Sequence, residues 1–104
     1  MIKVDVSSVA NQQIAVPFKD GTATISMYYS ALNSCWFCSI SYGDNTVNNI
    51  VIEYGVNFAY PFRYMFPFGL VCYTESEVRP VYVDSFESGE ATLILLEGEE
   101  NLPL

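Results

Sequence analysis

The sequence predicts an all-β protein, a small single-domain barrel or sandwich of about six to eight mostly antiparallel strands. Apolar and polar residues alternate with a period of two along most of the 104 residues, as in half-buried strands. Turn residues separate these stretches, and no stretch shows the 3.6-residue period of an amphipathic helix. We therefore expect one β domain over residues 1–104, with 98–104 as a short acidic C-terminal tail.

The clearest local prediction is a hairpin near residue 20. Ile14, Val16 and Phe18 alternate toward Asp20-Gly21, a pair that favours the positive φ of a two-residue turn. The returning strand has one apolar and one polar face. Its expected buried face consists of Ala23, Ile25, Met27 and Tyr29.

Further strands are predicted on both sides of this hairpin. Residues 2–6 alternate before it, and a strand after a turn at 31–33 has a second apolar face. This face consists of Trp36, Cys38, Ile40 and Tyr42. Later strands are expected at 49–54 and at 91–97, the last with two apolar faces and therefore buried on both sides. Any helix is expected to be a single turn near 84–87.

The segment from Gly55 to Gly69 breaks the alternation and contains six aromatic residues, Pro61 and Pro67. Proline cannot donate to a sheet ladder, so this segment is predicted to be an ordered connection across the sheet face. Two interpretations remain open. The aromatics are a lid that fills one end of the core, or they are a patch that binds partner proteins. The candidate interface residues are Phe58, Tyr60, Phe62, Tyr64 and Phe66.

The composition favours a protein that is held by partners. Charged residues make up only 15% of the chain, whereas apolar residues make up 51% and aromatic residues 15%. Charge normally keeps a surface hydrated and monomeric, and a core this small cannot easily bury so many aromatics. A compact tyrosine-rich domain without such a partner is the alternative.

The charge is concentrated in the last third of the chain. Residues 75–104 carry Arg79 against eight acidic residues, a net charge of −7, whereas residues 1–74 have a net charge of −1. We expect no nucleic-acid binding, because that binding depends on Lys and Arg. Residues 21–43 contain no charge, but repeated Ser and Thr argue against a membrane span. A soluble protein is predicted.

The residues for common catalytic chemistry are missing. The chain has no histidine, which excludes Ser-His-Asp and Cys-His nucleophilic pairs. Cys35-x-x-Cys38 is superficially like a zinc or redox motif, but positions three apart on a strand point to opposite faces, and Cys72 is the only other cysteine. The acidic residues are expected to be solvated. We therefore predict no enzyme, no catalytic residue, no cofactor and no metal site, with the cysteines as small core residues.

The order of these elements carries a resemblance. An alternating strand with a Gln-centred turn at Asn11-Gln12-Gln13 comes first, followed by the hairpin from Asp20 to Tyr29 and the Trp-bearing strand from Cys35 to Ile40. The segment Gly55-Val56-Asn57-Phe58 then leads through Tyr64 to Phe68-Gly69-Leu70. The last element is an apolar strand with an acidic end, from Ala91 to Glu100. Together they resemble the small baseplate plug family of contractile-tailed phages, known from cyanophage baseplates.

The resemblance covers about the whole chain, from Ile2 to Glu100. It implies a non-enzymatic, β-barrel-like virion component of the tail baseplate that is assembled in the host cytoplasm. Its partners would be hub or tube proteins at the distal end of the tail tube, with self-association in the assembly as a further expectation. Arg79-Pro80-Val81 departs from the family pattern, in which an acidic residue tends to precede the proline, so the 74–90 loop is expected to make contacts of its own. The residues alone also allow a free-standing module that recognises a glycan or a peptide through exposed aromatics.

Overall fold

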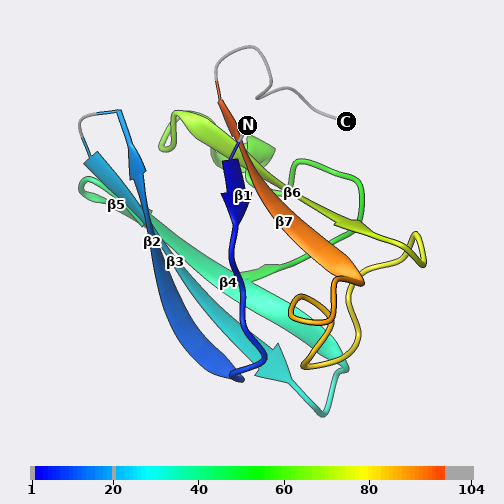
Figure 1. Ribbon diagram of the computed structural model, residues 1–104. Coiled ribbons are helices and arrows are strands. Elements are labelled where there is room, and N and C mark those ends of the chain that lie inside the picture. Colours follow the sequence, from blue (N-terminus) through cyan, green and yellow to red (C-terminus); the bar gives the residue numbers. More distant parts are fainter. Residues whose placement is uncertain (1, 20, 98–104) are drawn as a thin grey trace.

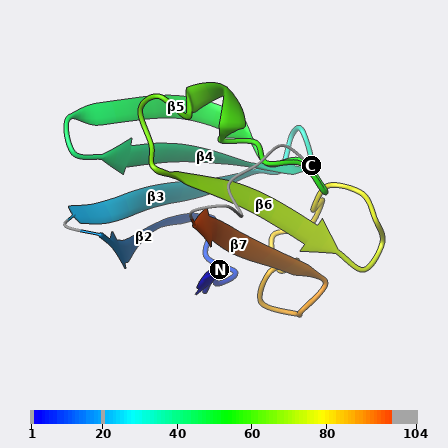
Figure 2. The same ribbon diagram turned by 90° about the horizontal axis from the view of Figure 1, so that it is seen from above.

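The computed structural model describes residues 2–19 and 21–97, which form two antiparallel sheets (Figure 1). The strands are β1 (Ile2–Val4), β2 (Asn11–Phe18), β3 (Gly21–Ser30), β4 (Cys35–Tyr42), β5 (Asn45–Val51), β6 (Phe68–Thr74) and β7 (Ala91–Glu97). One sheet has the order β1-β7-β6 and the other β2-β3-β4-β5. Seen from above, they lie face to face (Figure 2). The all-β prediction is confirmed, and of the two architectures the fold is a sandwich. The expected tail at 98–104 lies outside the described residues.

The β2–β3 hairpin forms as predicted, but its turn is one residue earlier than expected. Phe18 pairs with Gly21, so the two residues between the strands are Lys19 and Asp20, of which Asp20 lies outside the described residues. Lys19 has the positive φ, 54°. Gly21 leaves room for the side chain of Tyr42. A Cβ there would lie 3.2 Å from the ring of Tyr42, closer than ordinary van der Waals contact.

The predicted apolar faces of β3 and β4 meet the other sheet. Ala23, Ile25 and Met27 are buried on β3, and Trp36, Cys38 and Ile40 are buried on β4. Tyr29 and Tyr42 are partly buried against the same core. The period-two prediction is confirmed for these residues, which share one face of each strand, whereas Cys35 at the start of β4 is buried on the opposite face.

The strand predicted at 49–54 begins and ends earlier, as β5 at Asn45–Val51. The register shifts between Cys38 and Ile40, and Asn49 opposite this shift has a φ of 61°. Such a bulge bends a strand and interrupts its pairing. After it, the Ile52 N–H donates to the Trp36 carbonyl oxygen (3.0 Å), and the chain leaves the sheet.

The sandwich is closed on one side by the segment 52–59. Gly55 N–H donates to the carbonyl oxygen of Cys72 (2.9 Å), and Phe58 N–H donates to that of Leu70 (3.0 Å), so this segment covers the outer edge of β6. The buried Asn57 fixes the path, because its Oδ1 accepts from the Leu70 N–H (3.0 Å). The connection is ordered, as predicted, but this part of it runs along the edge of β6 and does not cross a sheet face.

The expected single helical turn is present, but its predicted position at 84–87 is wrong. The described residues contain one three-residue 3₁₀ turn, η1 at Tyr60–Phe62, which has Pro61 in its first turn. Proline suits this position because its fixed φ matches the helix and its missing N–H is not needed. At 84–87 the chain forms a tight turn instead, in which the Ser88 N–H donates to the Asp84 oxygen (2.9 Å).

The last strand has the predicted bounds. Leu93 and Leu95 of β7 face the other sheet and are fully buried. On its second face Leu96 is buried but Ile94 is only partly buried. The prediction of burial on both faces therefore holds for Leu96 and fails for Ile94, because no sheet covers that outer side.

The turn before β2 is held by a side chain from within β2. The expected Gln-centred turn at 11–13 is wrong in position, since these residues are paired in β2. The Gln12 Nε2 instead donates to the carbonyl oxygens of Ser7 (2.9 Å) and Val9 (2.8 Å), and its Oε1 accepts from the Ser7 N–H (3.0 Å). The glutamine thus satisfies the backbone of the preceding loop.

Trp36 connects the four-stranded sheet to the loop 75–90. Its ring is fully buried and meets Phe86 edge-on, with centroids 5.6 Å apart. Its Nε1–H donates to the Tyr82 carbonyl oxygen (3.0 Å). The Tyr29 hydroxyl donates to the Val81 carbonyl oxygen (2.6 Å). These bonds hold a long irregular loop against the core.

We predict that Trp36→Phe lowers the free energy of unfolding by about 1–3 kcal/mol, because the Tyr82 carbonyl loses its donor. Urea unfolding followed by far-UV circular dichroism measures this, since Trp36 is the only tryptophan and its fluorescence is lost. Leu32→Ser, at a side chain that is 94% exposed, is the control and should change stability by less than about 0.5 kcal/mol. Equal stability of the two variants would contradict this role of Trp36.

Candidate protein–protein interface

The five predicted interface residues do not share one face. Phe58 (8% exposed) and Phe66 (1% exposed) belong to the core, and Phe62 packs partly buried against it. Tyr60 is partly buried, and Tyr64 is 88% exposed. The lid interpretation therefore describes Phe58 and Phe66, and Tyr64 is the aromatic side chain of this set that projects into solvent.

An arginine orders this exposed tyrosine. The guanidinium carbon of Arg63 lies 4.4 Å from the ring centroid of Tyr60 and 4.8 Å from that of Tyr64. Its Nη1 donates to the Tyr60 carbonyl oxygen (3.3 Å), and its Nη2 donates to the Tyr64 hydroxyl (3.4 Å). Each exposed cation–π contact contributes about 0.5–1 kcal/mol. Arg63 and the two tyrosines therefore form one ordered unit.

Met65 extends this unit into a small surface patch. Its side chain is exposed, and its carbonyl oxygen accepts from the Asn45 Nδ2 (3.2 Å) at the start of β5. Behind it the rings of Phe66 and Phe68 stack in the core, with centroids 5.5 Å apart. We call Tyr60, Arg63, Tyr64 and Met65 the aromatic patch. It has a rigid support, which lowers the entropy that binding would cost.

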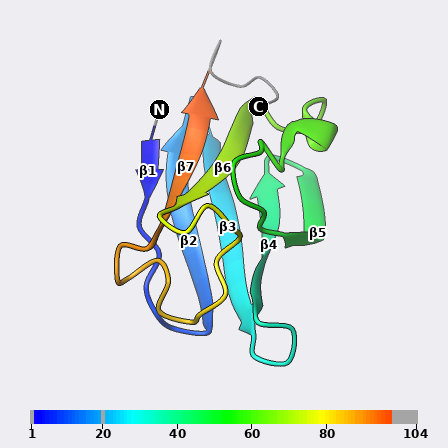
Figure 3. The same ribbon diagram turned by 90° about the vertical axis from the view of Figure 1, so that its right-hand side faces the viewer.

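The acidic residues gather elsewhere. Figure 3 shows η1 and the loop 75–90 on opposite sides of the molecule. The acidic residues of this loop are Glu75, Glu77, Asp84, Glu87 and Glu90. Its one basic residue, Arg79, pairs with Glu53 (3.5 Å), and both side chains are about half exposed. Such a pair contributes little to stability, and the loop keeps its negative charge.

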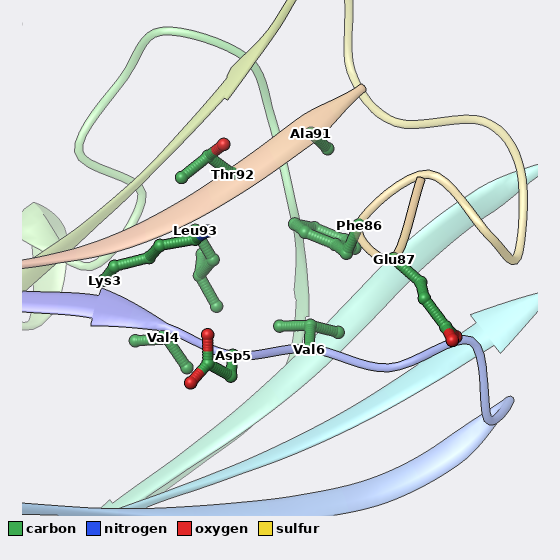
Figure 4. A pocket seen from close by; sticks show the side chains of 9 residues that line it. All are labelled: Lys3, Val4, Asp5, Val6, Phe86, Glu87, Ala91, Thr92 and Leu93. Atoms are coloured by element: carbon green, nitrogen blue, oxygen red, sulfur yellow. The ribbon is translucent and has the colours of Figure 1, made fainter. Parts of the chain in front are cut away.

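A shallow pocket of about 230 Å³ lies between β1 and this loop (Figure 4). Figure 4 shows the carboxylates of Asp5 and Glu87 directed to different parts of it. Glu87 is exposed, and its Oε2 accepts from the Ser8 N–H at 2.7 Å. Hydrogen bonding from the Ser8 side chain, and secondly from its N–H, holds the pKa of this carboxyl below its ordinary value. Glu87 therefore ties the loop 75–90 to the turn before β2.

A second groove, missed from the sequence, lies within the loop 75–90. It encloses about 480 Å³. Its lining residues are Ser76, Val78, Arg79, Val81, Tyr82, Ser85 and Glu90. Tyr82 is 67% exposed, although its carbonyl oxygen is held by Trp36. No periodic pattern marks this irregular loop, so the sequence alone could not place an aromatic beside these polar groups.

The three cysteines are free and buried. Burial raises the pKa of the Cys38 thiol to about 12. Burial also raises the pKa of the Cys72 thiol to about 12, with a smaller contribution from the charge of Glu90. Within 2–19 and 21–97 no group of three or more His, Cys, Asp or Glu residues could hold a metal ion. No helix in the same residues is long and apolar enough to cross a membrane.

A family model described as the cyanophage baseplate Pam3 plug gp18 matches residues 1–98 of the chain. The chain belongs to this family. Its members are baseplate plugs, so this protein has a structural role in a phage tail baseplate, lies in the tail of the virion and associates with other tail proteins. The resemblance seen in the sequence is thereby confirmed. No curated protein matches the chain.

We predict that Cys38 and Cys72 do not react with a thiol reagent in the folded plug-family protein at pH 8. Their thiols are neutral and enclosed, and the thiolate is the reactive form. The release of colour from an aromatic disulfide reagent should remain near zero until urea unfolds the chain. Rapid labelling of either residue at full native signal would refute this prediction.

The stability that Glu87 contributes should depend on pH. Its pKa is lower in the folded than in the unfolded chain, so the contribution is complete above the unfolded pKa of about 4.3 and is lost as pH falls through the folded pKa. We expect wild type to be more stable than Glu87→Gln at pH 7, with the difference shrinking below pH 4. Urea unfolding at a series of pH values measures it, and Glu77→Gln is the control. A difference that stays constant with pH would contradict the assignment.

Proposed function

We propose that this protein is a non-enzymatic plug subunit that contacts hub proteins at the distal end of the tail tube through the aromatic patch. Its assembly would take place in the host cytoplasm, where the three reduced cysteines remain free. The observation that carries the proposal is Tyr64, which is 88% exposed and yet held in place by Arg63. Family membership supports the baseplate setting.

The chemistry of the patch suits a protein partner. Tyrosine and arginine dominate the residues that contribute most to binding energy at interfaces. In the free protein Arg63 already spans Tyr60 and Tyr64, so little side-chain freedom remains to be lost on binding. Met65 adds a flexible apolar surface that adapts to a neighbour.

The acidic loop on the opposite side supports a second part of the proposal. We place the loop 75–90 against a basic neighbouring subunit or toward the DNA path. In the first position, complementary charge orients the subunit during assembly. In the second, like-charge repulsion prevents passing DNA from adhering. Five acidic residues in the loop, against the paired Arg79, supply the charge for either position.

The test is co-assembly of Tyr64→Ser and of Arg63→Ala with the hub proteins of the same tail. Each variant should retain the wild-type circular dichroism and bind about tenfold or more weakly, as expected for a central interface residue. Tyr82→Ser is the matched control, since it removes another exposed tyrosine, 67% exposed, from the other side of the molecule. If a folded Tyr64→Ser variant binds the hub as wild type does, the patch is not the contact.

The groove beside Tyr82 favours a second candidate, a module that recognises a glycan or a peptide. It combines an exposed aromatic ring with Ser76, Ser85 and Arg79, polar groups that could fix the orientation of a ligand. Light scattering on mixtures separates the candidates. A monomer that ignores hub proteins, binds glycans and loses this binding in Tyr82→Ser would replace the plug proposal.

A further inference from the structure

The two sheets have four outer edges, and three of them are blocked in ways that natural proteins use against unwanted strand pairing. The edge at β1 is only three residues long and carries Lys3. The edge at β6 is covered by residues 54–58. The edge at β5 is interrupted by the bulge at Asn49. The fourth edge is β2, with eight residues and no charge.

The backbone of β2 directs hydrogen-bonding groups along this edge, except for the N–H that Pro17 lacks. Phe18 and Gly21 close the two-residue hairpin, and the Tyr29 N–H donates to the Ala10 oxygen (2.8 Å), so even-numbered residues of β2 bond to β3. The odd-numbered residues point their N–H and C=O groups away from β3. These residues are Asn11, Gln13, Ala15 and Pro17, of which Pro17 has no N–H.

The space beside this edge is open. A groove of about 640 Å³ separates residues 12–15 from Asp5, Val6 and Ser7. In Figure 2, β1 lies toward the three-stranded sheet and out of line with β2, so the four-stranded sheet ends at β2. The opposite side of the sandwich is closed by the segment 52–59. The two sides of the molecule therefore differ in whether a strand can be added.

The charge distribution identifies the strand that fits. None of the four strands from β2 to β5 contains a charged residue, in a chain whose net charge is −8. Asp5 and Glu87 line the groove beside this edge, but the β2 residues that would pair are themselves uncharged. Two β2 strands can therefore pair without like charges directly opposite one another, which would destabilise the pairing.

We propose that two copies of this chain associate by antiparallel pairing of their β2 strands, which joins the four-stranded sheets into one continuous sheet. The register that leaves Pro17 out places Gln13 opposite Gln13 of the second copy, with Asn11 opposite Ala15 on each side. Every residue in these pairs has both an N–H and a C=O, so each pair exchanges two hydrogen bonds. This contact lies on the opposite side from the segment that leads to the aromatic patch and leaves that patch free.

The first test is sedimentation of wild type between about 1 µM and about 1 mM, where an edge contact of this size should give a concentration-dependent dimer. In Ala15→Pro the outward N–H is lost while the bonds to β3 remain, and Pro17 shows that β2 accepts proline at an odd position. We expect this variant to keep its circular dichroism and to remain monomeric. A monomeric wild type over the whole range, or a folded Ala15→Pro that dimerises normally, would overturn the proposal.

A charge-pair experiment tests the register and does not depend on proline. Gln13→Lys and Gln13→Glu each place two like charges opposite one another and should dimerise about tenfold more weakly. An equimolar mixture of the two should restore the dimer. The control pair, Thr24→Lys and Thr24→Glu, carries the same charges on the same face but one strand further in. If the Thr24 variants weaken dimerisation as strongly as the Gln13 variants do, the copies dock face to face, and the edge model is overturned.

Discussion

Trp36 is the residue on which the arrangement of the irregular segments depends. Its carbonyl oxygen receives the Ile52 N–H, where the chain leaves the four-stranded sheet, and its indole N–H reaches the Tyr82 carbonyl in the acidic loop. Its ring fills the space between Tyr29 and Phe86. A single buried residue therefore links one sheet with both long connections, through its backbone carbonyl on one side and its side chain on the other.

The sandwich is asymmetric because its two open sides are treated differently. On one side Asn57 holds the segment 52–59 against β6, and the chain continues from there into η1 and the aromatic patch. On the other side a loop clamped by Gln12 joins β1 to β2 without covering the β2 edge. The segment held by Asn57 supports the aromatic patch on one side of the sandwich, whereas no such segment covers the β2 edge on the other side. A subunit with one exposed anchor and one free edge is suited to a place between neighbours.

The distribution of charge follows this division. The four strands of the larger sheet carry no charge, and five acidic residues lie on the loop 75–90. Asp5, Asp44 and Glu53 lie in connections between other strands, and Glu97 ends β7. Uncharged sheet surfaces are prone to association, and natural β proteins usually protect them with lysine or a bulge. Under the proposed function, neighbouring subunits would cover such surfaces, which would account for the small share of charged residues in the chain, 15%.

The sequence by itself determined the all-β class, the inward faces of β3 and β4, and the bounds of β7, because a strand with one buried face must alternate with a period of two. It also indicated the baseplate plug family. Only the tertiary structure separated Phe58 and Phe66 in the core from Tyr64 in solvent. These three residues share the same parity in the sequence, but the helical turn η1, which begins at Tyr60, rotates the chain between them, so parity no longer predicts direction. The edge at β2 was decided in the same way, since pairing partners are set by contacts between distant segments and leave no mark in local periodicity.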